Sequence, residues 1–396
     1  MSRAPGVARP LAAMLAAQSL MSAATVALPV LAPKAAPDIG APVAWVGLFV
    51  SLVYGSSMVS GLAAGALVRR WGAVRLCQLC LLAACAGLAL IASGSRLGVA
   101  LGAVLIGAGY GPLNPASSHL LDRFTPAHRR ATIFSIKQTG VPIGAVLSGS
   151  ILPTLALTIG WPPALFALGV VCVLLAVLLQ GLRATCDDDR VPGTRLGLGD
   201  LAAPARLAHA DQAGWPLAWS SFCFAALQLC LGTYLVAYLT GELGYDLVRA
   251  GFVLALTQAA GVAGRLVAGA LADRGSARRV MGAMGCAMGV CALASSQAHT
   301  WPAIALLALY ALFGASAIGW NGVYLAEVAR RAPPGAVGTA TAAALFVTFA
   351  GVLTGPAIFG VLLQSGLPYG TAFVTVGVPA LACGLFLLQR RAEARA

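Results

Sequence analysis

Charged side chains are scarce in this chain. They make up 9% of its 396 residues, whereas hydrophobic side chains make up 59%. A soluble domain usually has about a quarter of its residues charged, so the composition excludes an ordinary soluble fold. The apolar residues fall into runs of about 20, which is the length of a helix that crosses a bilayer. The sequence therefore predicts an all-α polytopic membrane protein.

Acidic side chains are the scarcest charged group. The chain has 12 Asp and Glu against 25 Lys and Arg, a formal net charge of +13. A basic protein can bind nucleic acid, but these arginines stand in short clusters between apolar runs rather than along one basic face. The charge pattern therefore predicts a membrane topology and no nucleic-acid partner.

The sequence also lacks the groupings that hold metals, nucleotides or catalytic nucleophiles. Cys77 and Cys80 have the spacing of half a zinc or redox site, yet no second cysteine pair or histidine cluster accompanies them. Cysteines within apolar runs behave as small hydrophobic residues. We therefore expect no metal, no cofactor and no enzymatic activity.

Long apolar runs predict twelve membrane spans. They cover residues 11–31, 43–68, 76–93, 97–121, 131–155, 162–182, 217–239, 250–272, 280–297, 302–329, 337–364 and 371–389. One long polar connection, residues 183–215, separates the first six spans from the last six, and a short surface helix is expected near 198–210. The predicted domains are a six-helix bundle over 1–182, this cytoplasmic loop, and a second bundle over 216–396.

Lys and Arg in the loops predict the orientation of the spans. All of them except Lys34, Arg96 and Arg249 fall on the side that also holds both chain ends. Cytoplasmic loops carry the excess of positive charge. We therefore expect a multi-pass protein of the inner membrane with both termini in the cytoplasm.

The two halves repeat each other. Matching residues recur in the same order and at nearly constant spacing, and they include a turn and an asparagine pair. The matches join Gln18 with Gln228, Gly65 with Gly269, Asn114 with Asn321, Gly140 with Gly351, Gly144 with Gly355, and Gly149 with Gly360. Chance matches in a sequence rich in Ala, Gly and Leu are the alternative. Many transporters are built from such duplicated halves.

The turns after the second and eighth spans resemble the signature loop of the major facilitator superfamily. The first reads Gly65-Ala-Leu-Val-Arg-Arg70-Trp-Gly72, and the second reads Gly269-Ala-Leu-Ala-Asp273-Arg274. With the twelve spans, the resemblance covers the whole chain. It implies two pseudo-symmetric six-helix bundles that rock about a central site.

The two loop copies differ at one charged position. Arg69 stands where the family usually has an aspartate, so the usual ion pair of the first copy is absent. The second copy keeps Asp273, which we expect to cap the start of the eleventh helix, because a helix N-terminus favours an anion.

Glycines and prolines in the fifth and eleventh spans resemble a motif of the superfamily's antiporters, although they explain a kink whatever the substrate. The arginine usual in the fourth helix is missing. Residues expected to act in gating or packing are Gly65, Arg70, Gly72, Gly269, Asp273, Arg274, Gly140, Pro142, Gly355, Pro356 and Glu327.

Arg265 is the leading candidate for substrate binding. It stands inside an apolar run, where a charge costs a few kcal/mol or more and usually serves a function. Its place before Gly269 is similar to the eighth helix of the monocarboxylate, oxalate/formate and nitrate/nitrite branches, whose arginine binds the anion. A guanidinium can grip a carboxylate with two hydrogen bonds. The alternative is a structural arginine held by carbonyls of the seventh or eleventh helix.

Lys137 is the second cation inside a span. It lies roughly 9 Å from the start of its helix at 1.5 Å per residue. It could bind the anion, or its long stem could carry the ammonium to the interface. Other residues expected to line the path are Asn114, Asn321, Gln138, Gln18, Gln228, Tyr234 and Gln258, for which packing is the alternative except at the two asparagines.

These features predict a secondary transporter of a small organic anion, a carboxylate. Two cations without an acid in the middle of any span attract anions. The alternatives are a drug or cationic-metabolite efflux transporter and a membrane enzyme or sensor. We expect a monomer whose partners are the bilayer, its substrate, and a coupling proton or an exchanged anion.

Overall fold

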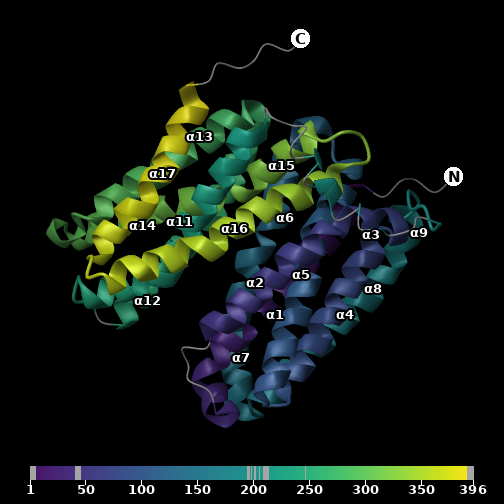
Figure 1. The fold of residues 1–396 in the computed structure, drawn as a ribbon, viewed down its shortest axis with the longest axis horizontal. Coiled ribbons are helices and arrows are strands. Elements are labelled where there is room, and N and C mark those ends of the chain that lie inside the picture. The colour runs from purple at the N-terminus through teal and green to yellow at the C-terminus, as the bar shows by residue number, and fades with distance from the viewer. Residues whose placement is uncertain are drawn as a thin grey trace. The chain divides into compact units, whose positions relative to one another are not determined.

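The structure is a computed structural model that describes residues 6–40, 46–193, 197, 199, 202–204, 206–207, 214–245 and 247–389. Over this part of the chain every regular element is a helix (Figure 1). Among the described residues, eleven helices are long and apolar enough to cross a membrane, and the number is twelve if one bent helix pair is counted as a single span. The predicted helical, multi-pass fold is confirmed. The short helix expected near 198–210 lies mostly outside the described residues.

The helices follow the predicted spans closely. The first half holds α1 (Ala8–Ile39), α2 (Val46–Leu62), α3 (Ala64–Trp71), α4 (Ala73–Ala92), α5 (Arg96–Phe124), α6 (Arg130–Gln138), α7 (Gly140–Thr158), α8 (Trp161–Leu178) and α9 (Arg183–Cys186). The second half holds α11 (Trp215–Gly241), α12 (Leu247–Arg274), α13 (Ala277–Ser295), α14 (Ala303–Gly319), α15 (Asn321–Arg331), α16 (Val337–Gln364) and α17 (Tyr369–Gln389).

Within the described residues, the second, fifth and tenth spans are each interrupted by a short break. The second span, expected as one helix over 43–68, bends by 58° between α2 and α3. At this bend the Ala63 N–H bonds to the Ser60 carbonyl three residues back, which tightens the turn. The fifth span breaks at Thr139 between α6 and α7, and the tenth breaks at Trp320 between α14 and α15.

The chain forms two compact units. Unit 1 consists of Met1–Pro126, Lys137–Ala210 and Val328–Phe346, and unit 2 consists of Ala127–Ile136, Asp211–Glu327 and Val347–Ala396. Each unit therefore contains most of one predicted bundle and a short segment from the other half of the chain. The domain limits drawn from the sequence stay a prediction.

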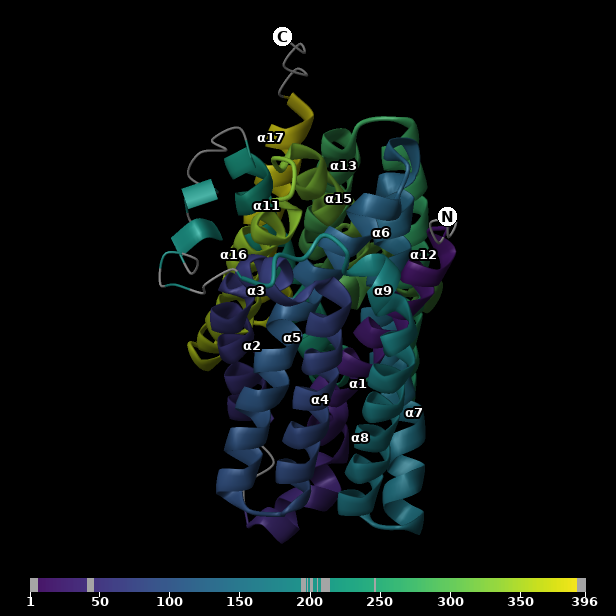
Figure 2. The same ribbon diagram turned by 90° about the vertical axis from the view of Figure 1, so that its right-hand side faces the viewer.

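Glycines set the helix crossings of unit 1. α5 packs between α2 and α4, α4 also packs on α8, and α1 packs on α7 (Figure 2). A Cβ on Gly107 of α5 would overlap the Val53 carbonyl of α2, and one on Gly144 of α7 would overlap the Ser19 carbonyl of α1. Such close approach of backbones is available to glycine alone.

Unit 2 repeats these crossings. α12 packs on α14 through Gly314, which faces the Thr257 carbonyl, and α16 approaches α11 where Gly355 meets Ala226. Gly107 and Gly144 thus have true counterparts, and the predicted internal repeat is confirmed at these crossings.

The same register corrects one predicted match. Gly144 faces Ser19 and Gly355 faces Ala226, so residues of α1 correspond to residues 207 positions later in α11. In this register the residue of α11 that corresponds to Gln18 is Ala225. Gln18 and Gln228 are therefore about one helical turn out of register and are not equivalent, because a single matching residue does not fix the register of a helix.

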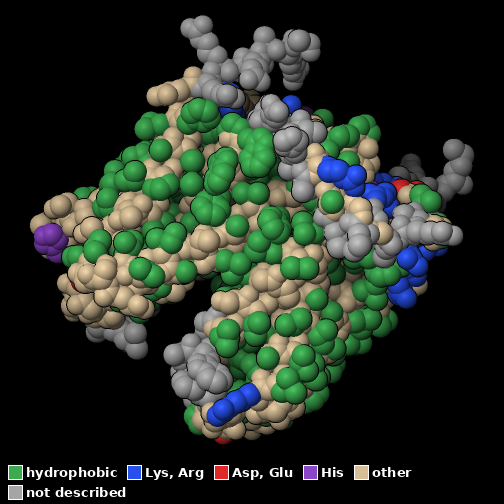
Figure 3. Space-filling view, viewed as in Figure 1, with side chains coloured by type: hydrophobic (Ala, Val, Ile, Leu, Met, Phe, Trp, Pro, Cys, Tyr) green, Lys and Arg blue, Asp and Glu red, His purple; other side chains and the backbone are tan. Residues whose placement is uncertain are grey.

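Hydrophobic side chains cover the flanks of the helices in each unit (Figure 3). Leu178 and Ile304, for example, are 74% and 78% exposed. Exposed large apolar side chains along helices of this length are what a bilayer would surround.

Candidate functional site

Arg265 lies buried in unit 2, with only 2% of its surface exposed. Its Nε donates a hydrogen bond of 2.8 Å to the carbonyl of Ile318. That carbonyl belongs to the last turn of α14, where the helix ends at Gly319 and carbonyls lose their partners within the helix. The break in the tenth span therefore supplies the acceptor that orients the guanidinium. The structural alternative weighed from the sequence named carbonyls of the seventh or eleventh helix, whereas this carbonyl comes from the tenth span.

A second group of polar side chains surrounds the same break. Gln228 of α11 accepts hydrogen bonds of 3.1 Å from Trp320 Nε1 and from Asn321 Nδ2. The Trp320 ring is fully buried and packs edge-on against Phe224. The structure therefore brings two predicted residues, Gln228 and Asn321, together.

Lys137 lies fully buried in unit 1. Its ammonium donates to Asn114 Oδ1 at 2.9 Å and to Ser117 Oγ at 3.1 Å. Both acceptors are neutral, and both lie on one face of α5, one turn apart. The side chain turns to these interior partners, which argues against the alternative that its stem carries the ammonium to the interface. Ser117 was missed, although its spacing of three residues from Asn114 was a usable signal.

The remaining predicted binding residues are more dispersed. Gln138 is buried at the end of α6. Tyr234 is half-buried, and its hydroxyl donates to the Pro356 carbonyl at 2.9 Å while its ring stacks on Phe359. Gln258 is half-buried on α12.

Gln18 of α1 is fully buried in unit 1. Neither its amide nitrogen nor its amide oxygen has a hydrogen-bond partner among the described residues. Its Cβ lies 2.9 Å from the place that a Cβ on Gly140 would take, so this glycine makes room for it. Pro142 and Gly144 follow in α7, and both are buried.

Asp273 caps a helix, as expected, but a different one. Its carboxylate accepts hydrogen bonds of 2.8 Å from the backbone N–H groups of Ala131 and Thr132, in the first turn of α6. The first N–H groups of a helix lack partners and carry partial positive charge. The carboxylate therefore caps a helix of the fifth span and not the eleventh helix. Gly269 lets α12 come close to Ser135 of α6.

The other predicted gating residues lie at helix ends or crossings. Gly65 approaches Thr339 within unit 1, and Gly355 approaches Ala226 within unit 2. Arg70 and Arg274 lie in the last turns of α3 and α12. Pro356 lies inside α16 and Glu327 is buried on α15.

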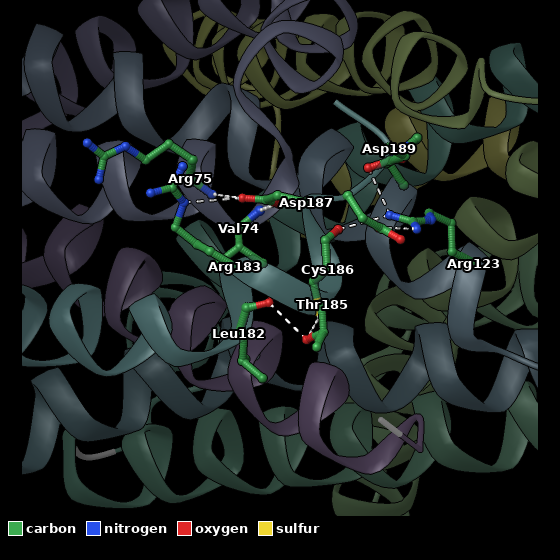
Figure 4. A network of polar contacts seen from close by, with 11 residues as sticks. Val74, Arg75, Arg123, Leu182, Arg183, Thr185, Cys186, Asp187 and Asp189 are labelled. Carbon is green, nitrogen blue, oxygen red and sulfur yellow. Dashed lines mark hydrogen bonds and ion pairs between the residues drawn. The ribbon is translucent and has the colours of Figure 1, made fainter. Parts of the chain in front are cut away.

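The acidic run Asp187–Asp189 forms a clasp on unit 1 that the sequence did not predict (Figure 4). Asp187 accepts from the backbone N–H groups of Val74 at 2.8 Å and Arg75 at 3.0 Å, so it caps α4. Gly72 precedes α4 with φ of 91°, and a Cβ there would overlap the Asp187 carboxyl. Only glycine suits both the conformation and the space.

The other two acids of the clasp bind side chains of α5. Arg123 pairs with Asp188 at 2.6 Å and with Asp189 at 2.8 Å, and His119 Nε2 lies 2.6 Å from Asp189. Burial raises the pKa of Asp187. Partial burial also pushes the pKa of Asp189 upward, but His119 and Arg123 outweigh it, and the pKa falls below its usual 3.8. The run of three acids in the long polar connection was the signal that the sequence offered.

Several known proteins are similar to this chain. An uncharacterised MFS-type transporter of Mycobacterium tuberculosis is 25% identical over 353 residues, covering 87% of this chain and 76% of that protein. The probable galactarate/D-glucarate transporter of Escherichia coli is 24% identical over 312 residues, with 70% and 68% covered. The cis,cis-muconate transport protein of Acinetobacter baylyi is 24% identical over 353 residues, with 86% and 83% covered.

Solved structures share the fold. The human organic anion transporter MFSD10 matches with a TM-score of 0.78 at 16% identity, covering 97% of this chain and 100% of that chain. The family model of the Major Facilitator Superfamily matches residues 13–356. That match takes in both halves of the repeat, and the chain therefore belongs to the Major Facilitator Superfamily.

Proposed function

We propose that this transporter moves a small organic anion, a carboxylate, across the inner membrane, with both of its termini in the cytoplasm. The observation that carries the proposal is the burial of Arg265 in the eighth span, where the Ile318 carbonyl holds its Nε. A charge inside a membrane span is costly and is retained mainly for function. Relatives named for galactarate/D-glucarate and cis,cis-muconate transport support the choice of carboxylates.

Each unit contributes one buried cation to the proposal. Arg265 offers a planar fork that suits a carboxylate, and the hydrogen bond from its Nε fixes the plane of that fork. Lys137 offers a point charge that the neutral oxygens of Asn114 and Ser117 hold in place. Both of these acceptors are neutral, so neither of them cancels the positive charge of the ammonium.

Transport follows by alternating access, in which the two predicted bundles rock while the substrate is held. The glycine crossings Gly144 and Gly355 let helices approach closely, and Asp273 and the acidic clasp act at helix ends as gating contacts. A monomer coupled to a proton or to an exchanged anion completes the proposal.

The proposal is tested by uptake into proteoliposomes that contain the purified protein. Labelled galactarate, cis,cis-muconate and benzoate are compared with a lipophilic organic cation, and protein-free liposomes give the background. We expect saturable uptake of at least one carboxylate, and competition by the others. Saturable uptake of the cation, with uptake of every carboxylate at background, would contradict the proposal. It would support transport of drugs or cationic metabolites instead.

A further inference from the structure

The amide of Gln18 is unusual among the buried polar groups of unit 1. The side chain has no exposed surface, and neither amide atom finds a partner in the described part of the chain. Buried polar groups are nearly always hydrogen-bonded. An interior amide with both atoms unpaired therefore suggests that something other than the protein satisfies it.

The surroundings of Gln18 place it beside the fifth span. Its Cβ packs at Gly140, the first residue of α7, directly after the break at Thr139. Lys137 lies on the other side of that break, three residues before Gly140. The buried ammonium therefore belongs to the interrupted fifth span, and the unpaired amide belongs to α1, which packs against that span.

Unit 2 shows how such an amide is satisfied within the protein. Gln228 receives hydrogen bonds from Trp320 and Asn321. In unit 1 the asparagine that matches Asn321 is Asn114, and its oxygen accepts the Lys137 ammonium instead. Gln18 also has no glutamine counterpart in the register of the repeat, which places Ala225 opposite it. Its amide is thus a feature of the first half alone.

The chemistry of the amide selects the group that it binds. Its nitrogen needs an acceptor and its oxygen needs a donor. A carboxylate only accepts and an ammonium only donates, so each would leave one amide atom unpaired. A hydroxyl group does both. We propose that Gln18 binds a hydroxyl of the transported acid, and that the substrates are hydroxylated carboxylates.

This inference rests on the carboxylate transport proposed above, with the carboxylate bound by a buried cation and the hydroxyl by Gln18. Galactarate and cis,cis-muconate are dicarboxylates of equal chain length, and only galactarate carries hydroxyl groups. They separate recognition of the hydroxyl from recognition of the charge. Gallate and benzoate form a second such pair.

The test measures kcat/KM for both dicarboxylates in proteoliposomes with the wild type, Gln18→Met and Gln18→Leu. We expect the wild type to prefer galactarate. Both variants should lower kcat/KM for galactarate roughly threefold to tenfold, the value of one neutral hydrogen bond, and leave muconate unchanged. Gln364→Met, at an exposed position near the end of α16, serves as the matched control.

Two results would overturn the inference while leaving carboxylate transport intact. One is an equal loss for both dicarboxylates, which would give Gln18 a structural role. The other is an unchanged ratio, which would mean that water satisfies the amide. If both variants fail to fold, thermal stabilisation of the wild type decides, because galactarate must stabilise it more than muconate does. Wild-type protein that transports no carboxylate, gallate and benzoate included, would overturn the proposed function itself.

Discussion

The ammonium of Lys137 lies 2.9 Å from Oδ1 of Asn114 inside unit 1. Asn321, the matching residue of unit 2, donates to Gln228 instead. By the repeat spacing that joins Gly140 to Gly351, the residue that corresponds to Lys137 is Thr348. The hydroxyl of Thr348 donates a hydrogen bond to the hydroxyl of Ser221. The halves thus keep the same asparagine but surround it differently, and only the first half adds a cation at this place.

Replacing Lys137 separates its charge from its packing. Lys137→Met keeps the length of the side chain and removes the ammonium, so we expect carboxylate uptake to fall at least tenfold. Stability should change by no more than about 2 kcal/mol, because removing a buried charge offsets the loss of its hydrogen bonds. Uptake and the unfolding temperature are measured on the same preparation.

Asn114→Leu is the matched comparison for that variant. It leaves the ammonium buried while removing its amide acceptor, so we expect a larger loss of stability, about 3 kcal/mol. If Lys137→Met transports carboxylates as the wild type does, Lys137 is a structural residue only.

Removing the cap of α6 should weaken the fold of unit 2. Asp273→Ala leaves the N–H groups of Ala131 and Thr132 without their acceptor, and we expect a loss of about 1 kcal/mol. Asp273→Asn keeps one acceptor oxygen and should lose less. Arg279→Gln, at an exposed position on α13, is the control. Equal unfolding temperatures for Asp273→Ala and this control would contradict the capping role.

Apolar run length and glycine spacing predicted most of the fold, because both follow from the thickness of a bilayer and the closeness of helix backbones. They placed the twelve spans and the glycine crossings at Gly144 and Gly355. They did not place the bend between α2 and α3, since no proline marks it.

The site was predicted less completely. Rare charges inside apolar runs identified Arg265 and Lys137 without any structure. Their partners depend on helix breaks and on which helix faces which, so the Ile318 carbonyl and the helix that Asp273 caps required coordinates. The clasp could not be predicted because its acids bind groups far away in the sequence. Asp187 accepts from backbone N–H groups at the start of α4, and Asp188 and Asp189 pair with side chains of α5.

Two glycines of α7 offer a matched test of its contact with α1. A Cβ on Gly144 would overlap the Ser19 carbonyl, whereas one on Gly149 would meet nothing within 4 Å. We expect Gly144→Ala to cost about 1–3 kcal/mol through overpacking and Gly149→Ala to gain about 0.5–1 kcal/mol through helix propensity. Thermal unfolding in one detergent compares them, and similar shifts for both variants would argue against this helix crossing.

The clasp should weaken in acid through Asp189. Its pKa is below 3.8 in the folded protein because His119 and Arg123 outweigh the effect of burial. A lowered carboxyl pKa stabilises the fold above the unfolded value, and this contribution is lost as pH falls through the folded pKa. Unfolding temperatures of the wild type and Asp189→Asn should therefore differ at pH 6 and converge towards pH 3. A difference that grows in acid would contradict this assignment.

Counterflow of a labelled carboxylate with Arg265 variants tests the central claim most directly, because exchange needs substrate binding but no coupling energy. We expect Arg265→Leu to abolish exchange and Arg265→Lys to lower it at least tenfold, since lysine keeps the charge and loses the fork. Arg279→Gln, at an exposed position on α13, should exchange like the wild type. Wild-type exchange by Arg265→Leu would contradict the assignment of this arginine to the anion.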